Sequence, residues 1–166
     1  FDDVTVAQPQ LDALRQQEYP VINPRAQQAM LDLIEQARST QDSVGGIIEC
    51  AVVGLPAGLG SPMLQTAEGR ISSMLFSVPA VKGVEFGAGF AIASMFGSEA
   101  NDCMQLENGA VRSDTNNNGG ILGGITSGMP VIVRAAIKPT PSISREQMTL
   151  NLTTQSVEPL VIHGRH

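Results

Sequence analysis

The sequence contains no tryptophan and one tyrosine, and only 4% of its 166 residues are aromatic. Proteins that bind single-stranded nucleic acids usually stack the bases on aromatic side chains, and those that bind duplexes present a basic surface. Here the formal net charge is −6, and the lysines and arginines are scattered along the chain without a dense run. The composition therefore argues against a nucleic-acid-binding protein.

Long apolar runs and cysteine clusters are missing as well. No apolar stretch approaches the roughly 18 residues that a membrane-spanning helix requires, and the first residues do not combine a basic region with an apolar one. The two cysteines are Cys50 in an apolar stretch and Cys103 in a polar one, with few other soft ligands in the chain. This pattern favours reduced thiols over a disulfide or a metal site. We therefore expect a cytoplasmic protein without a membrane segment or a metal.

The remaining composition suits a single globular domain, which we expect to span residues 1–166, because 42% of the residues are hydrophobic and the chain is long enough to bury a core. Apolar residues at helical spacing follow an Asn-Pro start signal and predict a helix over 24–40. A β-branched run after two glycines predicts a strand over 47–53. The same criteria predict a helix over 64–76 and strands over 81–86, 131–138, 148–152 and 160–162. This order of elements predicts an α+β fold with helices layered on antiparallel sheets.

Two stretches show no sustained period. Residues 1–22 combine scattered apolar residues with two prolines, and we expect only a weak strand and loop there. Residues 97–118 are polar and bordered by glycines, so little apolar surface is available to anchor them. We predict a long, mobile loop over this second stretch.

Glu49 and the glycine-rich loop 54–62 are two further candidates for a functional role. Glu49 lies on the strand face opposite Ile48 and Cys50, where it could act as a base or as a structural hydrogen-bond acceptor. No second carboxylate occurs at a matching spacing, which favours the structural role. The loop could close over a ligand, but packing is the simpler interpretation of its glycines.

The stretch that combines most features is 115–142, TNNNGGILGGITSGMPVIVRAAIKPTPS. Its predicted strand places Arg134 and Lys138 on one face, and Lys138 is followed directly by Pro139-Thr140-Pro141-Ser142. The prolines fix the backbone and lack amide donors, so two hydroxyls stand beside an ammonium group in an arrangement that suits a phosphate. Glycine runs beside a strand also form tight turns without any ligand, and neither common nucleotide-binding fingerprint occurs. These residues alone leave both interpretations open.

Several unusual motifs in a fixed order resemble the chorismate synthase family. They cover roughly residues 40–166, whereas residues 1–40 match only loosely. The motifs are SVGG with EC at 43–50, GLPAGLGSP at 54–62, VPAVKGVEFG at 78–87, GSEAND at 97–102, TNNNGGILGGITSG at 115–128, KPTPS at 138–142 and GRH at 164–166. Several such motifs in a fixed order are far more specific than any one of them.

The resemblance implies a fold, an activity and a cofactor. The fold would be a sandwich of helices between antiparallel sheets, and the activity would be the elimination of phosphate from 5-enolpyruvylshikimate 3-phosphate, which gives chorismate. The family needs reduced FMN although the reaction has no net redox change. The resemblance also implies a homotetramer, and it leaves open whether the chain uses NADP to reduce its own flavin.

Residue by residue, the resemblance places flavin contacts on Pro79 and Ala80, on Gly123, on Lys138, Pro139, Thr140, Pro141 and Ser142, and on Arg165. Each is physically sensible, since glycine permits close backbone approach, lysine and hydroxyls bind phosphate, and arginine can bind it bidentately. No catalytic residue is assigned, because the two catalytic histidines of the family lie in an N-terminal half that has no counterpart here. His163 is expected to be a surface residue, and His166 receives no role.

The resemblance further implies that the chain is a C-terminal-half fragment of a longer enzyme and stops short of its end. Such a fragment would not turn over substrate by itself. A non-enzymatic scaffold or interaction domain that keeps the fold without binding flavin is the alternative, and a flavin titration discriminates between the two. A different phosphate-binding enzyme is disfavoured by the order of the motifs.

Overall fold

The computed structural model describes residues 6–163. The chain divides into two compact units. The first, here called the sheet unit, contains Ile47–Ile137 together with the described residues up to Pro20. The second, here called the hairpin unit, contains Val21–Gly46 and the described residues from Lys138 onward. Each unit is described separately below.

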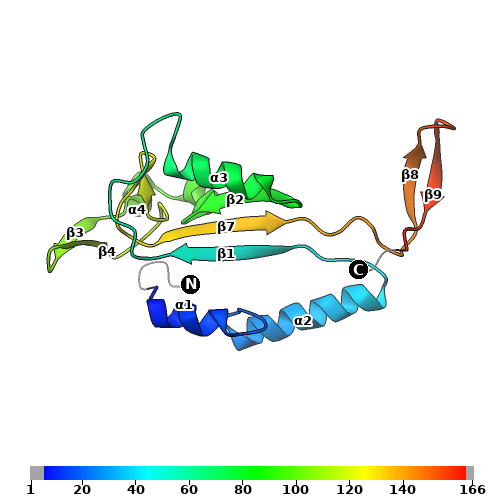
Figure 1. Ribbon diagram of the computed structural model, residues 1–166, viewed down its shortest axis with the longest axis horizontal. Coiled ribbons are helices and arrows are strands. Elements are labelled where there is room, and N and C mark those ends of the chain that lie inside the picture. Colours follow the sequence, from blue (N-terminus) through cyan, green and yellow to red (C-terminus); the bar gives the residue numbers. More distant parts are fainter. Residues whose placement is uncertain (1–5, 164–166) are drawn as a thin grey trace. The chain divides into compact units, whose positions relative to one another are not determined.

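A three-stranded sheet forms the centre of the sheet unit, with β1 (Gly46–Val52), β7 (Val131–Ile137) and β2 (Val81–Phe86) in the order β1-β7-β2. The strands β2 and β7 are antiparallel, and their register runs from Val81 opposite Ile137 to Phe86 opposite Val133. Figure 1 shows β1 and β7 side by side and running in opposite directions. These three strands confirm the predictions over 47–53, 81–86 and 131–138 to within a residue.

The helix α3 (Ala67–Ser77) packs against β2. The Thr66 hydroxyl accepts a hydrogen bond from the Gly69 amide at 2.9 Å and so caps the helix N-terminus. A capping threonine fixes where a helix begins. This cap explains why the helix begins three residues later than the predicted start at residue 64, while Pro79 ends it as expected.

A short glycine hairpin lies next to α3 and consists of β5 (Ile121–Leu122) and β6 (Ile125–Thr126). The loop 54–62 docks on it, because the Thr126 hydroxyl donates to the Pro56 carbonyl at 2.7 Å and accepts from the Leu59 amide at 2.9 Å. A side chain at Gly60 would collide with the Gly124 carbonyl. Gly60 therefore serves close packing, which agrees with the simpler interpretation made from the sequence, whereas a Cβ atom added at Gly54 or Gly58 would meet nothing within 4 Å.

The prediction of one long loop over 97–118 is wrong. This region contains the short helix α4 (Gly97–Ala100) and an antiparallel hairpin of β3 (Met104–Glu107) and β4 (Ala110–Ser113), and it follows a 3₁₀-helix, η1 (Gly89–Ser94). The hairpin turns at Asn108-Gly109, where both residues have positive φ, 51° and 80°. An Asn-Gly pair between two short alternating runs is a strong hairpin signal, and the sequence interpretation overlooked it.

Two of the three asparagines that follow the hairpin, Asn117 and Asn118, are anchored by a single carboxylate. Asp102 accepts hydrogen bonds from the Thr115 hydroxyl and from the backbone amides of Asn117 and Asn118, at 2.7–2.9 Å. Asn118 adds a side-chain bond to the same carboxylate at 2.8 Å. Burial alone would raise the pKa of Asp102, but these hydrogen bonds outweigh it and lower the pKa. Polar chain is thus held here by hydrogen bonds to one carboxylate rather than by apolar packing.

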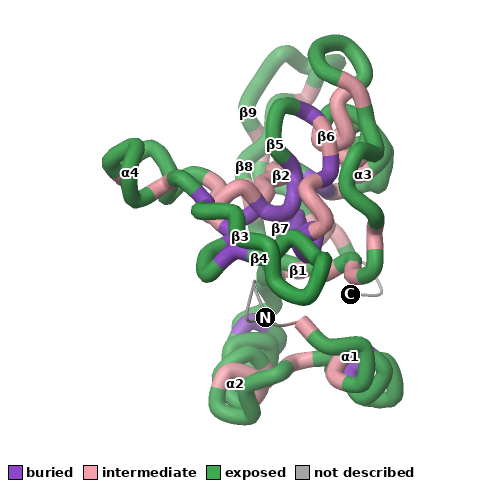
Figure 2. The backbone as a smooth tube through the Cα atoms, turned by 90° about the vertical axis from the view of Figure 1, so that its left-hand side faces the viewer, coloured by how far each residue is buried: buried purple, intermediate pink, exposed green. Residues whose placement is uncertain are grey.

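The core of the sheet unit surrounds β7. Figure 2 shows the buried segments gathered at this strand and at β5. Four large side chains are at most 2% exposed, namely Ile121, Met129, Val131 and Ile132. The asparagine and glycine residues 116–120 turn tightly beside these side chains. The Gly119 carbonyl accepts a hydrogen bond from the Ile132 amide at 3.3 Å. The loop before β7 therefore forms part of the cover of this central strand.

The N-terminal region contains a helix where only a weak strand and loop were expected. The helix α1 (Gln8–Arg15) has a proline in its first turn, and its two buried residues are Leu11 and Leu14. A first-turn proline is compatible with a helix, and two leucines three apart share one face. Two apolar positions were too few to establish a period from the sequence alone.

The hairpin unit contains the helix α2 (Pro24–Ser39) and a hairpin of β8 (Gln147–Asn151) and β9 (Ser156–Leu160). Asn23 caps α2 through hydrogen bonds from the amides of Arg25 and Ala26, as the Asn-Pro signal predicts. The predicted last strand at 160–162 is displaced, since β9 ends at Leu160. The fold as a whole is α+β with helices and antiparallel sheets, which confirms the predicted class.

Candidate functional site

Pro79 and Ala80 form a tight turn between α3 and β2. The Val81 amide donates to the Val78 carbonyl at 3.3 Å, and Ala80 has a φ of 72°. Proline at the second position and a positive φ at the third are the pattern of a type II turn, which normally requires glycine at the third position. Ala80 therefore adopts a strained backbone conformation, and such strain is concentrated at functional sites.

Gly123 lies at the turn of the β5–β6 hairpin with a φ of 58°. An added Cβ atom at this position would have nothing within 4 Å, whereas one at the neighbouring Gly124 would collide with Thr66 and the Ser61 carbonyl. The two glycines of one turn thus differ. Gly124 serves internal packing, and Gly123 leaves an open backbone surface that a flat group can approach.

The segment Lys138–Ser142 leaves the end of β7 and belongs to the hairpin unit. The Ser43 hydroxyl donates to the Thr140 carbonyl at 2.6 Å, and Gln147 donates to the Pro141 carbonyl at 3.0 Å. These bonds fix the backbone of the segment from two sides. Lys138 is exposed, and Thr140 and Ser142 are half-buried.

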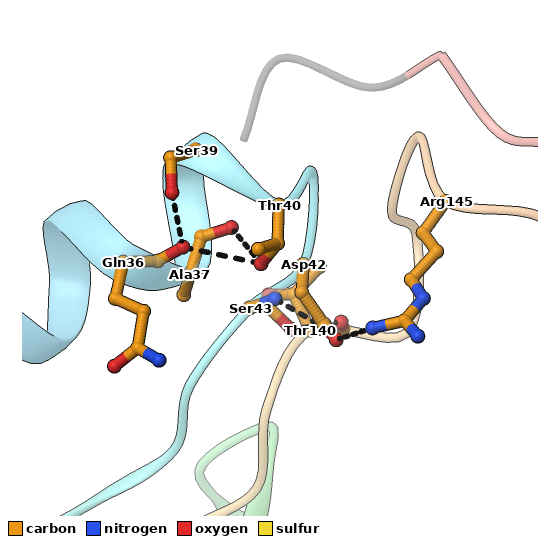
Figure 3. Close-up of polar contacts among 8 residues, drawn as sticks. All are labelled: Gln36, Ala37, Ser39, Thr40, Asp42, Ser43, Thr140 and Arg145. Carbon is orange, nitrogen blue, oxygen red and sulfur yellow. Dashed lines mark hydrogen bonds and ion pairs between the residues drawn. The ribbon is translucent and has the colours of Figure 1, made fainter.

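A cavity of about 490 Å³ in the hairpin unit brings Thr140 and Ser142 together with the last turn of α2. Figure 3 shows part of its wall, where Asp42 follows α2 and pairs with Arg145 at 3.1 Å. The cavity is lined by apolar side chains, hydroxyls, the Asp42 carboxylate and one cation, Arg38. Its lining residues are Ile34, Ala37, Arg38, Gln41, Asp42, Ser43, Val44, Thr140, Ser142, Ile143 and Ser144.

A charge cluster crosses the three strands of the sheet around Arg134. Its guanidinium lies 2.7 Å from the Glu85 carboxylate and 3.5 Å from that of Glu49, and it donates to the Gly87 carbonyl at 2.6 Å. A hydrogen bond from the Phe90 amide, together with Arg134, lowers the pKa of Glu85. Glu49 therefore has a structural partner, in agreement with the role favoured from the sequence. Glu85 was missed, because its proximity to Arg134 arises from strand pairing across 49 positions.

A second, more apolar cavity of about 370 Å³ lies in the sheet unit between α3 and the η1 segment. Its lining includes Glu68, Glu85, Phe86 and Phe90. Burial raises the pKa of Glu68. None of the sequence-predicted site residues contributes to this cavity.

The structure thus locates most of the predicted flavin positions. Pro79 and Ala80 directly precede Val81, whose strand partner Ile137 directly precedes Lys138. Thr140 and Ser142 share one cavity, and Gly123 lies on a separate turn. Arg165 and His166 lie outside the described residues, and His163 is exposed, as expected.

Metal and disulfide chemistry find no support among residues 6–163. Cys50 and Cys103 are free and exposed. No group of three or more His, Cys, Asp or Glu side chains in this part of the chain could hold a metal ion. None of the helices described here has the length and apolarity needed to cross a membrane.

Comparison with known proteins identifies the family. Residues 4–166, nearly the whole chain, match the sequence profile described as "Chorismate synthase". The chain belongs to this family. A chorismate synthase of Dehalococcoides mccartyi is 50% identical over 141 residues, and one of Thermococcus gammatolerans is 52% identical over 136 residues. These alignments cover 85% and 82% of this chain.

Structural comparison agrees with the sequence match. A structure titled "Crystal Structure of Chorismate Synthase" superimposes with a TM-score of 0.71 at 34% sequence identity, covering 78% of this chain and 40% of that one. The aligned regions of the Dehalococcoides and Thermococcus proteins likewise amount to 39% and 38% of those proteins. The chain therefore spans about two fifths of the length of the chorismate synthases that it matches.

Proposed function

We propose that this chain is the flavin-binding portion of a chorismate synthase, acting within a complete enzyme that converts 5-enolpyruvylshikimate 3-phosphate to chorismate with reduced FMN. The family match over residues 4–166 carries the proposal.

The residues present fit a flavin phosphate and its ring. Lys138 is an exposed cation, and Thr140 and Ser142 carry hydroxyls on a segment whose backbone is already fixed by Ser43 and Gln147. A fixed backbone lowers the entropic cost of placing donors around an anion. Arg165, proposed from the resemblance, would add a bidentate contact.

Pro79, Ala80 and Gly123 would instead approach the flat ring. The open surface over Gly123 and the short side chain of Ala80 both allow close contact with a planar group. Reduced FMN would supply electron density while the carbon–oxygen bond to phosphate breaks. The residues of this chain would bind and orient it, and no residue here is proposed to move the ring proton.

The remaining expectations from the family also stay proposals. We propose one domain over residues 1–166 within the longer enzyme, a homotetramer of that enzyme and a cytoplasmic location. The use of NADP to reduce the flavin stays open. We expect the 166-residue chain alone to form no chorismate from 5-enolpyruvylshikimate 3-phosphate and reduced FMN under anaerobic conditions.

The test uses a complete protein in which this chain replaces its matching region of the Dehalococcoides mccartyi chorismate synthase, here called the chimaera. FMN is titrated into the chimaera and into its Lys138→Ala variant, with binding followed by flavin fluorescence. A hydrogen bond to a charged group contributes about 1.5–3 kcal/mol, so the dissociation constant should rise by about one to two orders of magnitude.

The control for this titration is Arg112→Ala, which removes an exposed cation from β4. Arg134 shares the strand with Lys138 but pairs with two carboxylates, so its removal would disturb the sheet as well. Equal losses for Lys138→Ala and Arg112→Ala would contradict the phosphate role of Lys138. A folded chimaera that binds no FMN would favour the scaffold alternative.

A further inference from the structure

The strand β1 is apolar on both faces and yet exposed on both. Its sequence, Gly-Ile-Ile-Glu-Cys-Ala-Val, contains a single charged residue. Ile47 and Ile48 point to opposite faces and are 67% and 62% exposed. A nearly continuous apolar strand is typical of one that is covered on both faces. The sequence of β1 therefore suits a more enclosed position than the one it occupies in this structure.

The outer edge of β1 has little of the usual protection against further pairing, because Glu49 is its only charged residue. Within residues 6–163, β7 is its only strand neighbour. Edge strands usually carry lysine, proline or a bulge that prevents another strand from adding. β2, the opposite edge, carries Lys82 and an irregularity between Val81 and Gly83, and α3 packs against it. β1 has neither lysine nor proline in its seven residues.

We propose that the edge of β1 accepts a strand from the part of the chorismate synthase polypeptide that this chain does not match, and that this part also covers Ile47 and Ile48. We choose this occupant because much of the polypeptide is available to supply it. The chain spans only 39% of the Dehalococcoides protein, so about three fifths of that protein lies outside the match. The proposal rests on family membership and does not depend on FMN binding.

A second copy of this chain fits the edge less well. Glu49 is the central residue of the seven-residue strand. Two β1 strands paired antiparallel about their centres would place Glu49 opposite Glu49, and like charges directly opposite one another destabilise a sheet. A different polypeptide segment avoids this repulsion.

Amide hydrogen exchange of residues 46–52 tests the proposal, measured by mass spectrometry for the free chain and for the chimaera. Backbone amides that gain a strand partner exchange more slowly, so the chimaera should protect β1 by at least about ten-fold relative to the free chain. Exchange is read without flavin, so a chimaera that protects β1 but binds no FMN would refute the proposed function and leave this inference intact.

Ile48→Asp and Val157→Asp form a matched pair of variants, since Ile48 is 62% exposed and Val157 on β9 is 64% exposed. Circular dichroism should show that both variants fold as free chains. In the chimaera, Ile48→Asp should reduce β1 protection by at least about ten-fold, because burying an aspartate in place of an isoleucine is costly. Val157→Asp should leave it unchanged.

Three results would overturn the inference. The first is a folded chimaera in which β1 exchanges as fast as in the free chain. The second is protection, in the free chain at high dilution, of the β1 amides that do not face β7, which would mean that residues of this chain cover the edge. The third is protection of the free chain that rises with protein concentration, which sedimentation velocity would trace to a second copy.

Discussion

β7 and β1 are neighbouring strands of equal length with nearly the same chemistry, and they differ sharply in burial. Each has seven residues and one charged side chain, and these two charges, Arg134 and Glu49, meet at 3.5 Å. Ile132 on β7 is fully buried, whereas Ile48 on β1 is 62% exposed. The comparison teaches that place in the sheet, rather than composition, decides how much an apolar strand contributes to stability.

The segments that pack over β7 are themselves polar or rich in glycine. The Gly87 amide donates to the Ile132 carbonyl at 3.1 Å, and the Ile132 amide donates to the Gly119 carbonyl. Gly119 and Gly87 pack so closely that a side chain on either would collide with the backbone of the other segment. Two turns thus cover β7 within the sheet unit, while β1 has no second strand neighbour among residues 6–163.

The largest effect should come from replacing the same residue type in the two strands. Ile132→Ala removes fully buried atoms and should reduce the free energy of unfolding by about 2–5 kcal/mol. Ile48→Ala removes mostly exposed atoms and should change it by less than about 0.5 kcal/mol. Urea unfolding of the free chain measures both, and similar losses would show that β1 is as enclosed as β7.

Arg134→Met should have the next largest effect, because it leaves Glu49 and Glu85 together without their shared cation. Both carboxylates are about three quarters buried, at 25% and 28% side-chain exposure. The expected loss is about 1–3 kcal/mol, below that of a fully buried pair. The double variant with Glu49→Gln should recover part of this loss, and failure to do so would show that the two charges are not coupled.

Asp102→Asn tests the carboxylate that fixes the turn next to β7. Its loss should cost about 1–2 kcal/mol at neutral pH, because the amide that replaces it accepts fewer of the four hydrogen bonds. The folded-state pKa of Asp102 is lower than its ordinary value of 3.8. Its stabilisation is therefore complete above that ordinary value and is lost as the pH falls through the lower folded pKa.

The pH dependence supplies the measurement for this third prediction. Urea unfolding at a series of pH values below about 5 should show that the parent chain loses more stability on acidification than Asp102→Asn does. The pKa of Glu85 is lowered as well, so Glu85 also makes stability fall on acidification, and it does so in both proteins. Parallel curves for the two proteins would show that Asp102 is not linked to stability.

The smallest effect on stability should come from Ile48→Lys, which gives β1 the edge lysine that it lacks. The side chain is mostly exposed, so the unfolding free energy of the free chain should change by less than about 0.5 kcal/mol. Solubility should rise, because a charged residue opposes edge-to-edge association. Light scattering at increasing concentration measures this, and unchanged scattering would show that the β1 edge does not limit solubility.

The elements that the sequence predicted well are those with a long period or a clear boundary signal. α2 has an Asn-Pro cap and four turns of repeating apolar residues, and β7 has an apolar run between glycines and prolines. α1 and the β3–β4 hairpin are short, with eight residues and four residues per strand. Segments this short contain too few positions to separate a period from chance, so only the Asn108-Gly109 turn could have indicated the hairpin.

The candidate site was predictable only as separate motifs. Lys138 and Thr140 were recognised because cation, prolines and hydroxyls are adjacent in the sequence. Arg38 and Ser43 were missed, since their place in the cavity with Thr140 depends on a contact across 97 positions. The pairing of Glu85 with Arg134 likewise depends on strand register, which local pattern does not specify.

The order β1-β7-β2 has a consequence for biosynthesis. β1 is synthesised before residues 53–130, and its partner β7 comes only after them. Pairing of distant strands must first overcome the entropy of closing the intervening chain, so it is slow. During translation the Ile47-Ile48 pair is therefore an exposed apolar segment awaiting a late partner, and we expect β1 to be a preferred binding site for chaperones that act on nascent chains.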